Sequence, residues 1–227
     1  MPLIEVHGVS HAYDDARRVL DEVDVRFGEP RVGVVGANGS GKSTFARLVN
    51  GLVLPSTGTV TVDGLDTRRE GRAVRRKVGF CFTDPDAQIV MPTVAEDVAF
   101  GLRRRGLSKE QVEDRVRRAL AAYGLDGHAD HPAHLLSGGQ KQLLALASVL
   151  VTEPELLVMD EPTTLLDLRN ATMIADVVAG LAQQVLLVTH HLDLLHGFDR
   201  VLVFDEGRVV CDDSPAPAVA YYRKLMT

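Results

Sequence analysis

A glycine-rich segment carries the clearest chemical signal in this sequence. It reads Gly36-Ala37-Asn38-Gly39-Ser40-Gly41-Lys42-Ser43-Thr44. It follows a predicted strand and opens a predicted helix, so its backbone N–H groups and the positive end of the helix dipole point at the same place. We expect this loop to hold a phosphate chain, with Lys42 reaching the β- and γ-phosphates and the Ser43 hydroxyl binding Mg²⁺. A glycine-rich turn with a chance Lys-Ser pair is the weaker alternative.

Two carboxylates follow an apolar strand further along the chain. The strand Leu156-Leu157-Val158-Met159 ends in Asp160 and Glu161. In α/β folds, the carboxyl ends of the strands form the edge where ligands bind. We expect Asp160 to hold Mg²⁺ through water and Glu161 to act as general base on an attacking water. Alone, the pair also fits a solvated acidic turn; the phosphate loop upstream favours the catalytic interpretation.

A third motif is the start of a predicted helix at Leu136-Ser137-Gly138-Gly139-Gln140. Ser137 is a good N-cap, and the two glycines leave backbone N–H groups open to an anion. One nucleotide does not need two phosphate sites from one chain. We therefore expect this surface to face the nucleotide of another copy, with a simple capped helix start as the alternative.

The elements that must position these residues alternate between strands and helices, which predicts an α/β fold with a parallel sheet. Predicted strands cover residues 3–6, 23–27, 31–36, 58–64, 78–82, 156–160, 185–189, 201–204 and 208–210. Predicted helices cover residues 44–50, 93–107, 109–123, 137–151, 170–183, 192–197 and 214–224. The block 84–150 is almost entirely helical and is predicted to be inserted into a core formed by residues 1–83 and 151–227.

Composition narrows the class of protein. The 227 residues include 25 Lys and Arg against 31 Asp and Glu, a net charge of −6, which disfavours a nucleic-acid partner. Two cysteines, Cys81 and Cys211, cannot form a disulfide framework, so a reducing compartment is expected. The first residues do not look like a signal peptide, and the longest apolar run is too short to cross a bilayer.

The three motifs, in this order, resemble the ATP-binding cassette (ABC) family of transport ATPases, and the resemblance covers essentially the whole chain. It implies a RecA-like P-loop NTPase core, an antiparallel β-subdomain and an inserted α-helical subdomain, together forming a single nucleotide-binding domain over residues 1–227. It also implies a head-to-tail homodimer. Two ATP molecules, each with Mg²⁺, would lie between the phosphate loop of one copy and Ser137–Gln140 of the other.

The resemblance assigns roles to three further residues. Tyr13 matches an aromatic residue that stacks on adenine; a half-buried tyrosine at a strand end is the alternative. Asp167 matches a loop that crosses the dimer interface, although an acid at a helix N-terminus would look the same. His190 matches a switch histidine that contacts the γ-phosphate, and its neighbour His191 leaves the register open.

Two positions depart from the family pattern. Thr83 stands where the family usually has a glutamine that helps to bind Mg²⁺ and senses the membrane partner. A hydroxyl is shorter and would reach the ion only through water. Leu143 stands where an arginine is common in the helix after Gln140.

The stretch Asp84-Pro85-Asp86-Ala87-Gln88 and the following Pro92–Gly101 resemble the ATPases of energy-coupling-factor (ECF) importers. This implies a transmembrane coupling subunit, a substrate-binding membrane subunit and a location on the cytoplasmic face of the membrane. Because Thr83 replaces the usual glutamine in the coupling region, we expect the Gln88 amide to contact a docking helix of the partner, with a solvated loop residue as the alternative. The general likeness favours a biotin importer, with a cobalt or nickel importer, or another ABC transporter, as alternatives. A soluble DNA-repair or translation ATPase and a small-molecule kinase fit the motifs less well.

Three histidines, His128, His131 and His134, lie close together with Asp130 before the third motif. Their spacing would place them on one helical face, but Pro132 breaks that geometry. We interpret the segment as a polar loop rather than a metal site.

Overall fold

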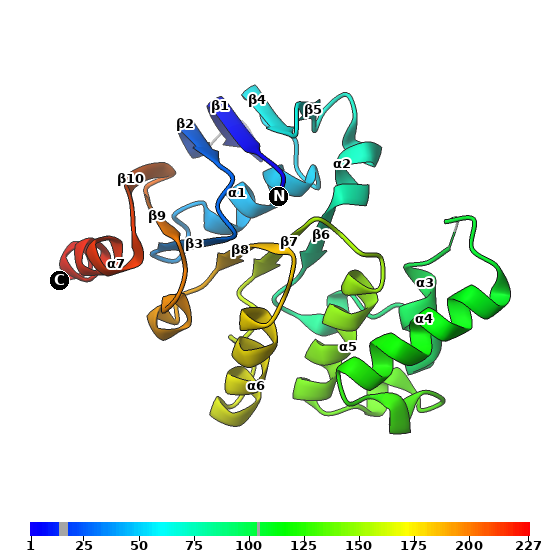
Figure 1. The fold of residues 1–227 in the computed structure, drawn as a ribbon. Coiled ribbons are helices and arrows are strands. Elements are labelled where there is room, and N and C mark those ends of the chain that lie inside the picture. The colour runs from blue at the N-terminus through cyan, green and yellow to red at the C-terminus, as the bar shows by residue number, and fades with distance from the viewer. Residues whose placement is uncertain (14–17, 104) are drawn as a thin grey trace. The chain divides into compact units, whose positions relative to one another are not determined.

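The computed structural model describes residues 1–13, 18–103 and 105–227. It divides into two compact units. The sheet unit comprises Met1–Phe80, Glu155–Glu161 and Leu181–Thr227, and the helical unit comprises Cys81–Pro154 and Pro162–Gly180. Figure 1 shows the strands and helices of both units.

The larger sheet of the sheet unit has the strand order β10-β9-β3-β8-β7-β6. These strands are β3 (Arg31–Gly36), β6 (Val78–Cys81), β7 (Leu156–Asp160), β8 (Gln184–Val188), β9 (Arg200–Asp205) and β10 (Arg208–Asp213). The pairs β9–β3, β3–β8 and β8–β7 are parallel, whereas β10 returns antiparallel to β9. Every residue of β7 and β8 is buried, as expected for strands covered on both faces.

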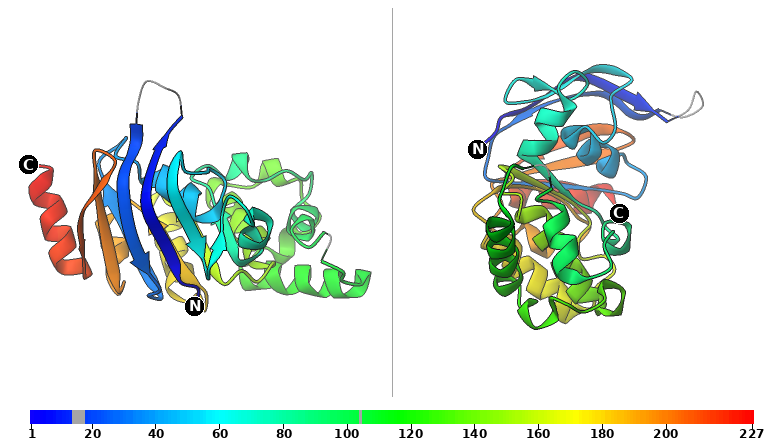
Figure 2. Two further views of the ribbon diagram at one scale, coloured as in Figure 1. Left: turned by 90° about the horizontal axis from the view of Figure 1, so that it is seen from above. Right: turned by 90° about the vertical axis from the view of Figure 1, so that its right-hand side faces the viewer.

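A second, antiparallel sheet has the order β2-β1-β4-β5. Its strands are β1 (Ile4–Ala12), β2 (Arg18–Phe27), β4 (Thr57–Val62) and β5 (Leu65–Asp66), and Figure 2 shows β1 and β2 running side by side. Helix α1 (Lys42–Asn50) contacts strands of both sheets. The sheet unit is completed by α2 (Gly71–Lys77), the short η4 (Leu192–Leu195) and α7 (Pro215–Leu225), which packs on β9 and β10.

The helical unit contains α3 (Val94–Phe100), α4 (Lys109–Ala122), α5 (Gly138–Leu150) and α6 (Leu168–Ala179). Short 3₁₀ turns flank them: η1 (Pro85–Ala87) precedes α3, and η2 (Asp126–His128) and η3 (Ala133–Leu135) lie between α4 and α5. Capping boxes start three of the helices, with Thr93 before α3, Ser108 before α4 and Ser137 before α5. Each cap satisfies backbone N–H groups that have no partner inside the helix.

A buried carboxylate organises the middle of the helical unit. Asp97 is 3% exposed, and its Oδ1 accepts hydrogen bonds from the backbone N–H groups of Val90, at 2.8 Å, and Met91, at 3.0 Å. Its Oδ2 accepts from the Ser148 hydroxyl at 2.9 Å. These bonds connect the loop before α3 to α5. They also stabilise the carboxylate, because a buried charge is unfavourable without hydrogen-bond donors around it.

The predicted fold class is confirmed, and the differences are local. The first two strands are longer than the predicted 3–6 and 23–27, and β5 and α2 were not predicted. Helix α3 ends at Phe100 rather than at residue 107, because Gly101, which follows Phe100 directly, weakens the helical pattern. The helical unit includes residues 162–180 in addition to the whole predicted block 84–150. In the described part of the chain, no helix is long and apolar enough to span a bilayer.

Candidate active site

The phosphate loop between β3 and α1 requires glycine at its two ends. Gly36 has φ +154°, and a Cβ there would lie 2.2 Å from the Phe204 carbonyl oxygen. Gly41 has φ +101°, and a Cβ there would lie 2.6 Å from Leu20 Cδ2. A side chain at either position would clash with neighbouring strands, so the loop closes this tightly only with glycine. Asn38, Gly39 and Ser40 form the turn between them.

The Lys42 ammonium lies against this loop. Its Nζ donates to the carbonyl oxygens of Gly36 at 2.8 Å and Ala37 at 2.9 Å. Burial lowers the pKa of Lys42, while the charges of Glu161 and Asp160 oppose that shift. The ammonium group thus lies on the loop, where it can neutralise the charge of a bound phosphate.

Ser43 and Asp160 meet although they are far apart in the sequence. The Ser43 hydroxyl donates to Asp160 Oδ1 at 2.7 Å, and Arg47 approaches Oδ2 at 3.5 Å. Asp160 is 1% exposed, and burial raises the pKa of its carboxyl, against the lowering effects of the Ser43 hydrogen bond and of Arg47. A hydroxyl and a carboxylate oxygen are hard ligands, so this pair fits Mg²⁺.

Sequence analysis missed Arg47. It lies four residues after Ser43 on α1, so both side chains share one face of the helix. That spacing was the available signal.

Glu161 lies just beyond β7 with a left-handed backbone, φ +54°, which is uncommon for glutamate. Its N–H donates to the Val188 carbonyl at 3.0 Å, at the end of the neighbouring parallel strand β8. Its Oε2 lies 2.5 Å from His190 Nδ1. The adjacent ends of β7 and β8 thus bring together the two residues that were predicted to act on the γ-phosphate side. His191 directs its backbone N–H to the Thr189 hydroxyl.

Tyr13 lies beside the phosphate loop. Its hydroxyl is 3.2 Å from Thr44 Oγ1, and its ring packs edge-to-face on His11 with centroids 4.7 Å apart. The side chain is 58% exposed, so a face of the ring is open to a ligand.

The remaining predicted residues belong to the helical unit. Ser137 Oγ accepts from the Gln140 N–H at 3.3 Å, and Gln140 Oε1 accepts from the Ser137 N–H at 2.9 Å. A Cβ on Gly139 would lie 2.3 Å from Asn170 Oδ1 on α6. Asp167 caps α6 by accepting from the Asn170 N–H at 2.9 Å. Asn170, which was not predicted, therefore adjoins both Gly139 and Asp167; Gly138 is exposed.

Gln88 uses its amide within the chain. Its Oε1 accepts from the Phe82 N–H at 3.1 Å, and its Nε2 donates to the Ala145 carbonyl at 2.9 Å. Thr83 is half-buried in the loop that these bonds close. The amide therefore supports the loop 82–88, and the contact of Gln88 with a membrane partner stays a prediction.

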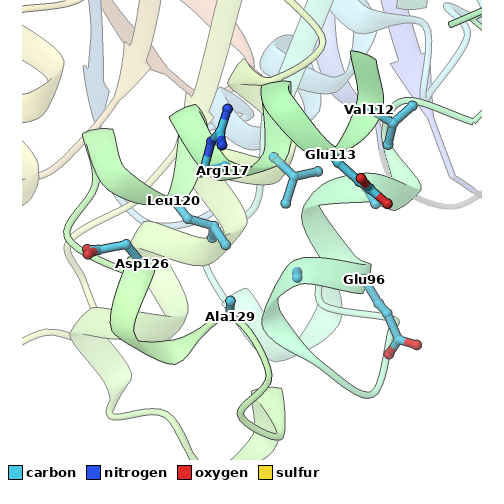
Figure 3. Close-up of a pocket in the computed structure, with 10 residues that line it drawn as sticks. Glu96, Val112, Glu113, Arg117, Leu120, Asp126 and Ala129 are labelled. Atoms are coloured by element: carbon cyan, nitrogen blue, oxygen red, sulfur yellow. The ribbon is translucent and has the colours of Figure 1, made fainter. Parts of the chain in front are cut away.

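An apolar pocket of about 400 Å³ opens elsewhere in the helical unit, between α3 and α4 (Figure 3). Val112, Val116 and Leu120 of α4 face Ala95 and Ala99 of α3 across it. None of the predicted site residues lines it.

Comparison with known proteins agrees with this geometry. The ABC transporter family model matches residues 21–164. The biotin transport ATP-binding protein BioM of Rhizobium etli is 50% identical over 210 residues, covering 92% of this chain and 93% of BioM. The energy-coupling factor transporter ATP-binding protein EcfA1 of Symbiobacterium thermophilum is 44% identical over 235 residues, covering 96% of this chain and 82% of EcfA1.

Two solved structures are similar across the fold. The structure of cbiO1 from Clostridium perfringens, part of the ABC transporter complex cbiONQ, has a TM-score of 0.84 and 32% identity, covering 98% of this chain and 92% of that one. The dimeric ATP-binding cassette MJ0796, in a post-hydrolysis state with ADP and Pi, has a TM-score of 0.82 and 27% identity, covering 93% and 98%.

The chain belongs to the ABC transporter family. It is an ATPase of this family, an ATP-binding subunit of the kind found in ABC and ECF transporters. The resemblance inferred from the three motifs is confirmed.

The buried Asp160 predicts a trade-off between stability and ligand binding. Because its folded pKa is raised, the ionised carboxylate lowers stability at neutral pH, and this cost disappears at acid pH. Asp160→Asn should therefore raise the melting temperature of the nucleotide-free protein by roughly 2–4 °C. It should also abolish the strengthening of ATP binding by Mg²⁺.

Thermal unfolding and nucleotide titrations with and without Mg²⁺ measure both effects. Asp205→Asn, at the end of β9, is the matched control and should change neither. A melting temperature of Asp160→Asn below that of the wild type would contradict the assigned cost of burial.

Proposed function

We propose that the chain hydrolyses MgATP as a head-to-tail homodimer and drives the uptake of biotin through an ECF-type importer. The observation that carries the catalytic part is one cluster in the sheet unit. Lys42 follows the carboxyl end of β3, and Asp160 and Glu161 lie at the carboxyl end of β7. His190 follows β8, the strand between them, and contacts Glu161 at 2.5 Å. Such a cluster supplies positive charge, hard oxygen ligands and a base in one place.

Each residue of the cluster has a distinct task. Lys42 and the loop N–H groups of residues 36–44 bind the β- and γ-phosphates. Ser43 and Asp160 hold Mg²⁺, which supplies charge neutralisation when it is bound. Glu161 accepts the proton of the attacking water, and His190 orients Glu161 and the γ-phosphate. Tyr13 stacks on the adenine.

The second copy completes the site in this proposal. Ser137, Gly138, Gly139 and Gln140 present a capped helix start to the γ-phosphate held by the partner's loop. Asp167 lies at the same interface. The dimeric state of MJ0796 bound to ADP and Pi supports this arrangement.

The membrane part rests on the relatives. Similarity to EcfA1 and to cbiO1 of the cbiONQ complex supports a peripheral subunit that works with a transmembrane coupling subunit and a substrate-binding membrane subunit. Similarity to BioM favours biotin over cobalt, nickel or another cargo. The location proposed is the cytoplasmic face of the membrane.

Replacing the base should trap the dimer. Glu161→Gln keeps the size of the side chain but is a far weaker base, so hydrolysis should fall by at least about 100-fold while ATP binding persists. The variant should then dimerise with ATP and Mg²⁺. Sedimentation velocity with each nucleotide measures this.

Glu206→Gln is a matched control, because Glu206 is also a glutamate with positive φ at the end of a strand. It should hydrolyse ATP at the wild-type rate and remain monomeric. A Glu161→Gln protein that stays monomeric at saturating ATP would contradict the homodimer.

Coupling should depend on Gln88 more than on Thr83. Removing the Gln88 amide leaves the Phe82 N–H and the Ala145 carbonyl unpaired and loosens the loop 82–88. Gln88→Ala should leave ATP hydrolysis by the isolated chain within about twofold and reduce uptake by the assembled importer roughly five- to tenfold. Thr83→Ala should change both modestly.

ATPase rates and uptake, measured in parallel for Gln88→Ala and Thr83→Ala, decide which of the two residues couples hydrolysis to uptake. Unchanged uptake in Gln88→Ala, or loss of ATPase activity in the isolated chain, would assign Gln88 a different role.

The substrate is tested by uptake. The chain should be expressed with candidate coupling and substrate-binding membrane subunits, in cells that lack their own biotin importer. We expect ATP-dependent uptake of labelled biotin that Lys42→Ala abolishes. Uptake of Co²⁺ or Ni²⁺ instead of biotin would reassign the cargo while leaving the ATPase intact.

A further inference from the structure

The side chain of Gln140 is held from two directions. Its Oε1 accepts from the Ser137 N–H at 2.9 Å, and its Nε2 lies 3.2 Å from His128 Nε2. An amide nitrogen only donates, so His128 Nε2 must accept. The ring therefore carries its hydrogen on Nδ1.

The position of the His128 ring is set by its own segment, residues 126–131. The Leu125 N–H donates to the Leu120 carbonyl of α4 at 2.8 Å, and the Ala95 N–H of α3 donates to the Ala129 carbonyl at 2.9 Å. The His131 ring packs edge-to-face on His128, with centroids 5.0 Å apart. Figure 3 shows Asp126 and Ala129 of this segment lying below α4. These contacts fix the position of the His128 ring, to which the Gln140 side chain is hydrogen-bonded.

Stability alone does not explain this ring. His128 Nδ1 is buried and finds no hydrogen-bond partner among the residues that the structure describes. A histidine kept for stability would pair both nitrogens, because an unpaired buried N–H is unfavourable. The ring instead directs its accepting nitrogen at Gln140.

We propose that His128 is a positioning residue for the second phosphate site. By holding Gln140, it keeps the Ser137–Gln140 capping box closed. Ser137 Oγ then accepts from the Gln140 N–H, which leaves its own hydrogen to donate to a phosphate oxygen of the partner's nucleotide. This inference rests on the proposed head-to-tail dimer.

The contact is sensitive to protonation. A proton on His128 Nε2 would set two donors against each other, and the Gln140 amide would be released. The contact with the Gln140 amide therefore requires a neutral imidazole that accepts at Nε2. Charged and titratable groups on these elements include Asp126, Asp130 and His131 on its own segment, Glu96 and Asp97 on α3, Arg117 on α4 and Lys141 on α5. Arg117 pairs with Asp114, and Lys141 with Asp86.

The test measures ATP-driven dimerisation in the Glu161→Gln background, with three added variants. His128→Leu removes the acceptor and should weaken dimerisation roughly five- to tenfold. His128→Gln places an amide oxygen near the position of Nε2 and should stay within about twofold. His134→Gln changes an exposed histidine of the same loop and should have no effect. ATP affinity of the monomer should be the same in all of them.

Rescue by the conservative variant separates positioning from folding. His128→Gln should dimerise more strongly than His128→Leu, because only the glutamine offers an acceptor oxygen to the Gln140 amide. Equal loss of dimerisation in the two variants, or wild-type dimerisation by His128→Leu, would overturn the inference. If His128→Leu is unfolded in a thermal melt, the comparison of the parent with His128→Gln decides alone. A parent that never dimerises overturns the proposed dimer first, and the role of His128 with it.

Discussion

The hydrogen bond between Ser43 and Asp160 is the constraint on which the catalytic unit depends. It joins residues 117 positions apart at 2.7 Å, one on the helix after the phosphate loop and one at the end of β7. The bond forms because parallel strands place their carboxyl ends at one edge of the sheet. The contact between the loop and the end of β7 also fixes the positions of Glu161, directly after β7, and of His190, just after β8. The rest of the sheet keeps these ends in register.

Sequence predicted the catalytic elements well because their signals are local. The glycines around Lys42 and the buried strand before Asp160 each define a conformation within ten residues, and the capping box at Ser137 does the same for α5. The full lengths of β1 and β2 were not predictable in this way. Their extension is fixed by pairing between strands, and β1 pairs with both β2 and β4. Such pairing overrides local propensity.

The residues whose roles were missed share a cause. Asn170 adjoins Gly139, and His128, which was interpreted as part of a polar loop, contacts Gln140; both act through partners that the sequence did not indicate. Arg47 is the exception, since its separation from Ser43 by four residues on one helix was visible. Gln88 was singled out for the right chemistry, a donor and an acceptor in one side chain, but its partners are backbone groups of its own unit. Composition can identify a versatile group without identifying its partner.

Gln88 and Gln140 solve the same physical problem in two places. Each amide is held by hydrogen bonds inside the helical unit, so the surface around it is already ordered before a partner binds. Binding then loses less conformational entropy, which is the usual benefit of preorganisation. Preorganisation also makes each contact a point of control, because one hydrogen bond sets whether the surface is ready. At Gln140 that bond ends on an imidazole, the side chain whose charge changes nearest neutral pH, whereas at Gln88 it ends on a carbonyl that does not titrate. In the proposed dimer, the surface at Gln140 therefore depends on a neutral imidazole, whereas the loop at Gln88 depends on a backbone carbonyl that is always neutral.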